Sequence, residues 1–169
     1  MKNLLEKDYP AYYGTYINHV KNDDCVLAME ENLNDFVTFI ENISIEKHNY
    51  KYQDNKWSIK DIVRHIIDTE RIFAYRALRF ARFDSTPIAG FEENDYAANV
   101  NTTTIEMPDL LQEFILVRKS TIKLFDSFTQ EMLVAKGTAS GKEISVLAIG
   151  FIISGHAIHH QNVMAERYL

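Results

Sequence analysis

Residues 146–160 have the sequence VLAIGFIISGHAIHH, an apolar run that leads into two histidines four residues apart. The run is well short of the roughly 20 residues that cross a bilayer, so it predicts a helix in the core of the protein. Residues four apart lie one above the other on a helix, so His156 and His160 can bind one cation together. His159 points about 100° away from His156 and is expected to play a different part.

Two histidines do not hold a metal alone, since about four ligands are expected at a zinc-like site. His19 and His48 lie in polar, aromatic-rich segments without apolar periodicity, whereas His65 lies on an apolar stripe with helical spacing. Burying an imidazole without a partner costs roughly 1–3 kcal/mol. His65, His156 and His160, on two helices, would satisfy one another through a cation, and hydrogen-bonded core histidines are the alternative. The stripe consists of Ile62, His65, Ile66, Thr69 and Phe73.

Composition favours a cytoplasmic protein with a single domain over residues 1–169. The chain has 169 residues, of which 46% are hydrophobic, enough to bury one core. Its net charge of −6 argues against a nucleic acid or an anionic membrane as a partner. Cys25 is the only cysteine, so no intrachain disulfide can form, and the N-terminus lacks the apolar region of a signal peptide. A reducing cytoplasm is therefore the expected compartment.

Apolar residues recur at helical spacing, and only 3 prolines and 6 glycines interrupt the pattern, so the predicted fold is all-α. Four long helices are expected over 24–43, 58–82, 107–128 and 144–168. Asp24 and Ser58 suit helix N-caps, and Asp61 completes a variant of the capping box. Residues 1–22 are expected to pack on the bundle without a binding role, and their tyrosines are Tyr9, Tyr12, Tyr13 and Tyr16.

Two connections between the expected helices are distinctive. Residues 83–106 form a long link that contains Phe91, Asp95 and Tyr96 among further acidic residues. Long loops in compact domains are often lids, so these side chains could cover a site, and a solvated loop is the alternative. Residues 137–142 are rich in turn formers and predict a short hairpin-like excursion.

Three local motifs follow one another along the chain: WSIKDIVRH at 57–65, DTER at 68–71 and GHAIHH at 155–160. With them the chain resembles the DinB-like superfamily, the DNA-damage-inducible, YfiT-like group of metal-dependent enzymes. The resemblance implies a four-helix bundle with a long crossover connection, usually a homodimer, and a divalent metal held by three histidines at one end. The ligand positions of the family fall on His65, His156 and His160. Characterised relatives resemble thiol-dependent transferases or isomerases and metal-dependent hydrolases.

Three neutral imidazoles leave a coordination position open, as is typical of a catalytic metal site. Water there would have its pKa lowered toward ~7 by zinc, and a thiol there would be a thiolate. Ala157 stands where the HExxH helix of a metalloprotease has glutamate, so protease chemistry is not expected. Imidazole ligands suit several divalent ions. Of these, zinc or nickel is expected first, and iron or manganese next. A low-molecular-weight thiol is a further candidate cofactor.

The sequence names no catalytic residue beyond the ligands. Asp68 is three residues after His65 and could orient an imidazole or contact a substrate, and Asp95 and Tyr96 are weaker candidates. The prediction is a metal-dependent enzyme that acts on a small molecule as a hydrolase or a thiol-dependent transferase. The alternative is a non-catalytic, stress-related binding or dimerisation protein with a vestigial metal site. Ion pairs between helices or in a dimer are expected from Glu70, Arg71, Arg76, Glu166 and Arg167.

Overall fold

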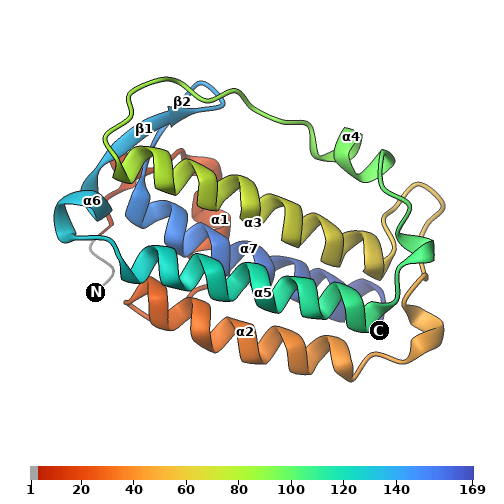
Figure 1. Cartoon of the computed structure of the whole chain (residues 1–169). Helices are drawn as coiled ribbons and strands as arrows, with labels where there is room; N and C mark the ends of the chain where they lie inside the picture. Colours follow the sequence, from red (N-terminus) through yellow and green to blue (C-terminus); the bar gives the residue numbers. More distant parts are fainter. Residues whose placement is uncertain (1–3) are drawn as a thin grey trace.

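The computed structural model describes residues 4–169, apart from the side chain of Glu6 (Figure 1). Four long helices form a bundle, which confirms the predicted fold: α2 (Cys25–Glu41), α3 (Ile59–Ala81), α5 (Met107–Asp126) and α7 (Val146–Arg167). The shorter helices are α1 (Gly14–Ile17), α4 (Glu93–Ala98), α6 (Gln130–Val134) and the 3-10 helices Glu6–Asp8, Ala11–Tyr13, Ile45–Lys47 and Thr102–Thr104. Two strands, β1 (Lys136–Ala139) and β2 (Lys142–Ser145), precede α7.

The connection between α3 and α5 crosses the whole bundle. These two helices run in the same direction, so the chain must return along the length of the bundle before α5 begins (Figure 1). Near its start the crossover meets the hairpin, where Ile88 forms a parallel bridge with Ala139. Near its end α4 and the 3-10 helix Thr102–Thr104 contact α3. The long crossover is therefore held at both ends.

The starts of α2 and α3 follow the predicted capping. The carboxylate of Asp24 accepts hydrogen bonds from the backbone N–H groups of Val26 and Leu27. Ser58 and Asp61 form a reciprocal capping box, in which each side chain accepts a hydrogen bond from the backbone of the other residue. These contacts satisfy N–H groups that a helix leaves unpaired at its first turn.

The predicted excursion over 137–142 is an antiparallel hairpin, and it shortens the last helix. Ser140 and Gly141 form its two-residue turn with φ of 51° and 72°, the positive values that tight hairpin turns require. Ile144 and Ser145 were expected to be helical but belong to β2, so α7 begins at Val146. The hydroxyl of Ser145 then caps the helix.

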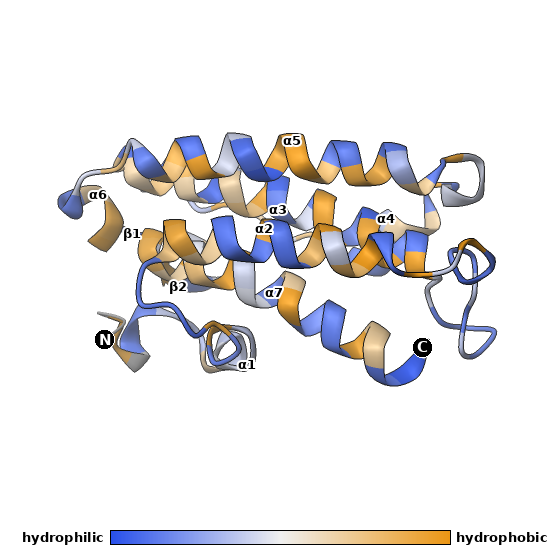
Figure 2. Ribbon diagram, turned by 90° about the horizontal axis from the view of Figure 1, so that it is seen from below, coloured by the Kyte–Doolittle hydropathy of each residue, from blue (hydrophilic) through white to orange (hydrophobic). Residues whose placement is uncertain are grey.

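The helix α7 is the centre of the bundle. Its residues from Val146 to Ala157 are buried, except that Leu147 is half-buried, and it contacts α1, α2 and α3. A helix that is apolar on all sides must be covered on all sides. By contrast, α2 and α5 alternate between hydrophobic and hydrophilic residues along their length (Figure 2). In the described part of the chain, no helix is long and apolar enough to span a membrane.

A buried ion pair joins α3 to α5. The carboxylate of Glu70 lies 2.9 Å from Nη2 of Arg118, and both side chains are almost fully buried. Arg118 also donates to Oδ1 of Asn32 at 2.7 Å and to the carbonyl of Met29 at 3.3 Å, both on α2. One guanidinium therefore links three of the four long helices.

The other expected ion pairs are only partly present. Arg71 binds Glu113 of α5 at 2.8 Å, which confirms its predicted interhelical pair. Among the described side chains, Arg76, Glu166 and Arg167 have no oppositely charged group within ion-pair distance, so they form no ion pair between helices of the chain. Ion pairs of these three in a dimer stay a prediction. Arg167 at the end of α7 instead donates to the hydroxyl of Tyr52, and Arg76 donates to the hydroxyl of Ser140.

Cys25 should be unreactive in the folded protein. Its side chain is 5% exposed at the start of α2, and burial is the main cause that raises the pKa of the thiol to about 12. The thiolate is the nucleophile, so iodoacetamide at pH 8 is expected to modify less than a tenth of the native protein while urea-unfolded protein reacts fully. Mass spectrometry of the alkylated protein measures both. Equal labelling in the two states would contradict the burial of this thiol.

Candidate functional site

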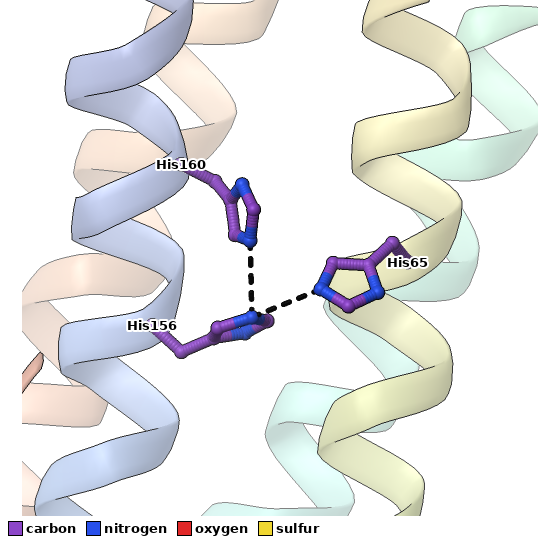
Figure 3. Close-up of side chains that lie close together, drawn as sticks. All are labelled: His65, His156 and His160. Carbon is purple, nitrogen blue, oxygen red and sulfur yellow. Dashed lines mark hydrogen bonds between the residues drawn. The ribbon is translucent and has the colours of Figure 1, made fainter. Parts of the chain in front are cut away.

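Three histidine side chains meet between α3 and α7. His65 lies in the second turn of α3, and His156 and His160 lie one turn apart in the second half of α7. The Nε2 atom of His156 is 3.0 Å from Nε2 of His65 and 3.1 Å from Nε2 of His160 (Figure 3). Candidate ligand atoms of all three lie within 4.8 Å of one another. No other cluster of this kind occurs among the described residues.

Burial keeps the three imidazoles neutral. It lowers the pKa of His65 to about 4 and, together with the neighbouring histidines, lowers the pKa of His160 to about 3. The pKa of His156 falls well below its usual value, first through burial and then through His160 and His65. At neutral pH each ring therefore carries one N–H and one nitrogen lone pair, the form that binds a metal.

The geometry of the cluster suits a cation better than it suits hydrogen bonds alone. Nε2 of His156 carries either one proton or one lone pair, so it can make one good in-plane hydrogen bond. Two other Nε2 atoms lie at hydrogen-bond distance from it, and they compete for that single position. A cation between three lone pairs satisfies all three rings at once. The residues present therefore fit a divalent metal.

Neighbouring side chains hold the rings of His65 and His156. The hydroxyl of Thr69 lies 3.4 Å from Nδ1 of His65, and the ring of Trp57 lies 4.7 Å from the His65 ring. The ring of Tyr16 meets the His156 ring edge-on at 5.3 Å. These contacts leave the Nε2 atoms to face one another, since a partner at the other nitrogen sets which one is free.

His159 stands apart from the cluster, as its position on the helix predicts. Its ring lies 5.3 Å from the ring of Tyr16 and 6.0 Å from that of His19. Both neighbours belong to the N-terminal segment rather than to α3. His159 therefore contacts the segment that covers α7, while His156 and His160 face α3.

Asp68 lies near His65 but binds arginines. Its carboxylate is 3.4 Å from Nη1 of Arg71 and 3.8 Å from Nη1 of Arg64. Burial raises the pKa of Asp68, and the two arginines act in the opposite direction. The side chain at Nδ1 of His65 is Thr69 and not Asp68, so the predicted orienting contact is not the one observed. A contact between Asp68 and a substrate stays a prediction, because Asp68 and His65 line the same narrow pocket.

The crossover covers this pocket with α4. Phe91 and Tyr96 line it, and their rings meet at 5.2 Å. Tyr96 is half-exposed, while Asp95 is exposed, faces none of the pockets at the cluster, and uses its backbone carbonyl to accept from Asn99. The structure thus brings Tyr96 near His65 and leaves Asp95 in solvent, and a catalytic role for either stays a prediction.

A larger cleft of about 230 Å³ opens at His156. The 3-10 helix Ala11–Tyr13 and α1 form one wall, and Tyr12, Tyr13 and Tyr16 line it. From the sequence, packing on the bundle was the only role expected of these tyrosines. The signal that could have revealed them is their spacing, since positions 12, 13 and 16 of a helical segment share one side.

Gly155 allows the N-terminal segment to lie this close. A Cβ atom at this position would stand 2.1 Å from the backbone oxygen of Tyr16, a distance that no packed structure accepts. The absent side chain therefore lets the backbone around Tyr16 rest directly on α7, next to His156.

Comparisons with known proteins agree with this architecture. The sequence profile of the DinB superfamily matches residues 28–164. Among solved structures, YfiT from Bacillus subtilis, described as a probable metal-dependent hydrolase with an unusual four-helix bundle topology, superimposes with a TM-score of 0.75. The match covers 97% of this chain and 90% of YfiT at 14% sequence identity, and at that identity it shows the fold alone. No curated protein sequence matches significantly. Because the family profile covers most of the length, the chain belongs to the DinB superfamily.

Proposed function

We propose that this protein is a divalent-metal-dependent hydrolase of a small molecule, with His65, His156 and His160 as the metal ligands. The observation that carries the proposal is the convergence of three neutral imidazoles, with Nε2 to Nε2 distances of 3.0 and 3.1 Å, beside open clefts. The description of YfiT as a probable metal-dependent hydrolase supports the same reaction class.

The residues of the chain provide the rest of the site. A divalent ion held by three histidines supplies Lewis acidity and lowers the pKa of a coordinating water or thiol. Thr69 and Trp57 fix the ring of His65, and Tyr16 shields one side of His156 from water. The same open position would accept a thiol, so thiol-dependent transfer is the variant of this proposal that substrate screening must separate from hydrolysis.

Metal analysis tests the proposal directly. Protein purified without a metal-binding tag and reconstituted with zinc or nickel is expected to hold about one ion per chain by elemental analysis. His65→Ala and His156→Ala should each lose the ion, because two imidazoles bind much more weakly than three. His159→Ala is the matched control, since this neighbouring histidine faces away from the cluster and should leave the metal content unchanged.

Enzymatic activity is measured on the same samples. Hydrolysis of a panel of small esters, amides and lactones should be detectable in the loaded protein, disappear on chelation and return on adding the ion. If the wild-type protein binds no metal after reconstitution, the proposal fails and the non-catalytic binding protein becomes the better account. Circular dichroism of each variant shows whether the protein is still folded when the ion is lost.

A further inference from the structure

Arg76 is a buried arginine without an acidic partner. Only 2% of the residue is exposed, and Nη2 donates to the hydroxyl of Ser140 at 3.1 Å. Its guanidinium lies 5.3 Å from the ring centre of Phe73 and 5.9 Å from that of Phe91. Nε has no hydrogen-bond partner. Among the described side chains, no carboxylate lies within ion-pair distance.

The other arginines that lie between the long helices have such partners. Arg118 is paired with Glu70, and Arg64 is paired with Glu113. A buried guanidinium stays protonated, so its charge is costly unless an anion compensates it. Burial lowers the pKa of Arg76, which is the expected sign of an uncompensated buried charge. Arg76 therefore differs from Arg118 and Arg64 in having no anion that compensates its charge.

Arg76 and His156 line the same cleft. On α3, the side of the helix that faces this cleft carries Thr69, Phe73 and Arg76, at positions that follow helical spacing. Thr69 and Arg76 are seven residues apart in sequence, which corresponds to about 10 Å along the helix axis. Thr69 contacts the metal-site residue His65, so the cleft extends from the histidine cluster to the guanidinium.

The remaining lining restricts the charge of a ligand. Tyr13 and Tyr16 also line the cleft, and their phenol hydroxyls can donate to an anionic oxygen. Glu92 and Glu93 line the same cleft and oppose a highly charged anion. The carboxylate of Glu92 already accepts hydrogen bonds from the backbone and side chain of Asn94. Arg76 is the single positive group in this lining and can pair with one carboxylate, while the two acidic residues repel any further negative charge on the ligand.

We propose that the cleft binds a small organic carboxylate, whose carboxylate group pairs with Arg76 while its other end reaches the three histidines. The contact of the ligand with the three histidines rests on the proposed function, whereas the pairing of its carboxylate with Arg76 does not. The substrate would then be an elongated monocarboxylate whose reacting bond lies several ångströms from the carboxylate.

The first measurement uses metal-free protein, so that it does not depend on the ion. Hexanoate and its uncharged counterpart hexanamide are titrated separately, with binding followed by changes in NMR chemical shift. Hexanoate is expected to bind at least about 10-fold more tightly, because hydrogen bonds to charged groups are the stronger ones. Equal affinities for the two compounds would overturn the proposal.

Variants identify the residue responsible. Arg76→Gln should abolish the preference for hexanoate, whereas Arg79→Gln should keep it, since Arg79 lies one turn further along α3 and is paired with Asp84. Arg76→Met should have a melting temperature equal to or higher than that of the wild type, because it removes an unpaired buried charge. A preference for hexanoate that survives in Arg76→Gln would assign the carboxylate to another site and overturn the proposal.

The second measurement tests the connection to the histidines. Zinc-loaded protein is titrated with 6-mercaptohexanoate, 6-mercaptohexanol and hexanoate by calorimetry. The compound with both groups should bind at least about 10-fold more tightly than either compound with one, and Arg76→Gln should remove the advantage over the alcohol. If neither zinc nor nickel binds, the proposed function fails while the hexanoate result still decides the role of Arg76. If zinc binds but the thiol and the carboxylate together give no added affinity, the ligand does not reach from Arg76 to the histidines and that part of the inference is wrong.

Discussion

Replacing Arg118 with methionine is expected to lower the free energy of unfolding by about 3–5 kcal/mol. The guanidinium holds the buried carboxylate of Glu70 and donates to Oδ1 of Asn32, so its loss leaves a charge and an amide oxygen without partners. The cost comes mainly from Glu70, which would remain buried and uncompensated. Urea unfolding followed by circular dichroism measures the change.

Two comparisons show whether burial is the cause. Lys123→Met removes an ion pair with Asp126 on the same helix, but Lys123 is 81% exposed, so the urea midpoint should change little. The double variant Glu70→Leu with Arg118→Met removes both charges and should recover most of the stability lost in Arg118→Met alone. If Arg118→Met unfolds at the wild-type urea concentration, the pair does not contribute as proposed.

Gly155→Ala is expected to displace the N-terminal segment from α7. The new methyl group would meet the backbone oxygen of Tyr16 at 2.1 Å, and a backbone atom cannot turn aside as a side chain can. Overpacking of this kind costs about 1–3 kcal/mol, which exceeds the gain of about 1 kcal/mol from replacing glycine in a helix. Hydrogen exchange should become faster over residues 4–22 while α3 and α5 keep their protection.

The matched control for this variant is Gly14→Ala. A Cβ atom there would lie 3.9 Å from Tyr9, an ordinary contact, and the residue has a helical conformation with φ of −55°. Its exchange pattern should match that of the wild type. Gly155→Ala should also bind hexanoate more weakly, because Tyr12, Tyr13 and Tyr16 would leave the cleft wall. Unchanged exchange over residues 4–22 in Gly155→Ala would contradict the packing described for this segment.

The long helices were predictable because their signals are local. Ser58 and Asp61 cap α3 within one turn, and the apolar run from Val146 to Ile153 had to be buried whatever its neighbours were. The start of α7 was misplaced by two residues, because Ile144 suits a helix or a strand equally and only its pairing with β1 decides between them.

The site was predictable to the extent that it follows helix geometry. His156 and His160 are one turn apart, and His65 lies on the stripe that faces α7, so their convergence follows from two helices packed side by side. The partners of Arg76 and the place of Tyr16 depend on which segment crosses which helix. Charge alone suggested an ion pair for Arg76, whereas its neighbour is the hairpin turn at Ser140, 64 residues later.

The cleft at His156 also constrains how the protein can acquire activity during folding. Its walls come from the N-terminal tyrosines, α3, the crossover at Phe91, the hairpin at Ser140 and finally α7. Contacts between segments so far apart in sequence form late, because long loops must close before such contacts are gained. A nascent chain therefore has no complete site until residue 156 has been synthesised. Ligand binding should appear in one step with the last stage of folding, which makes it a sensitive reporter of the complete native state.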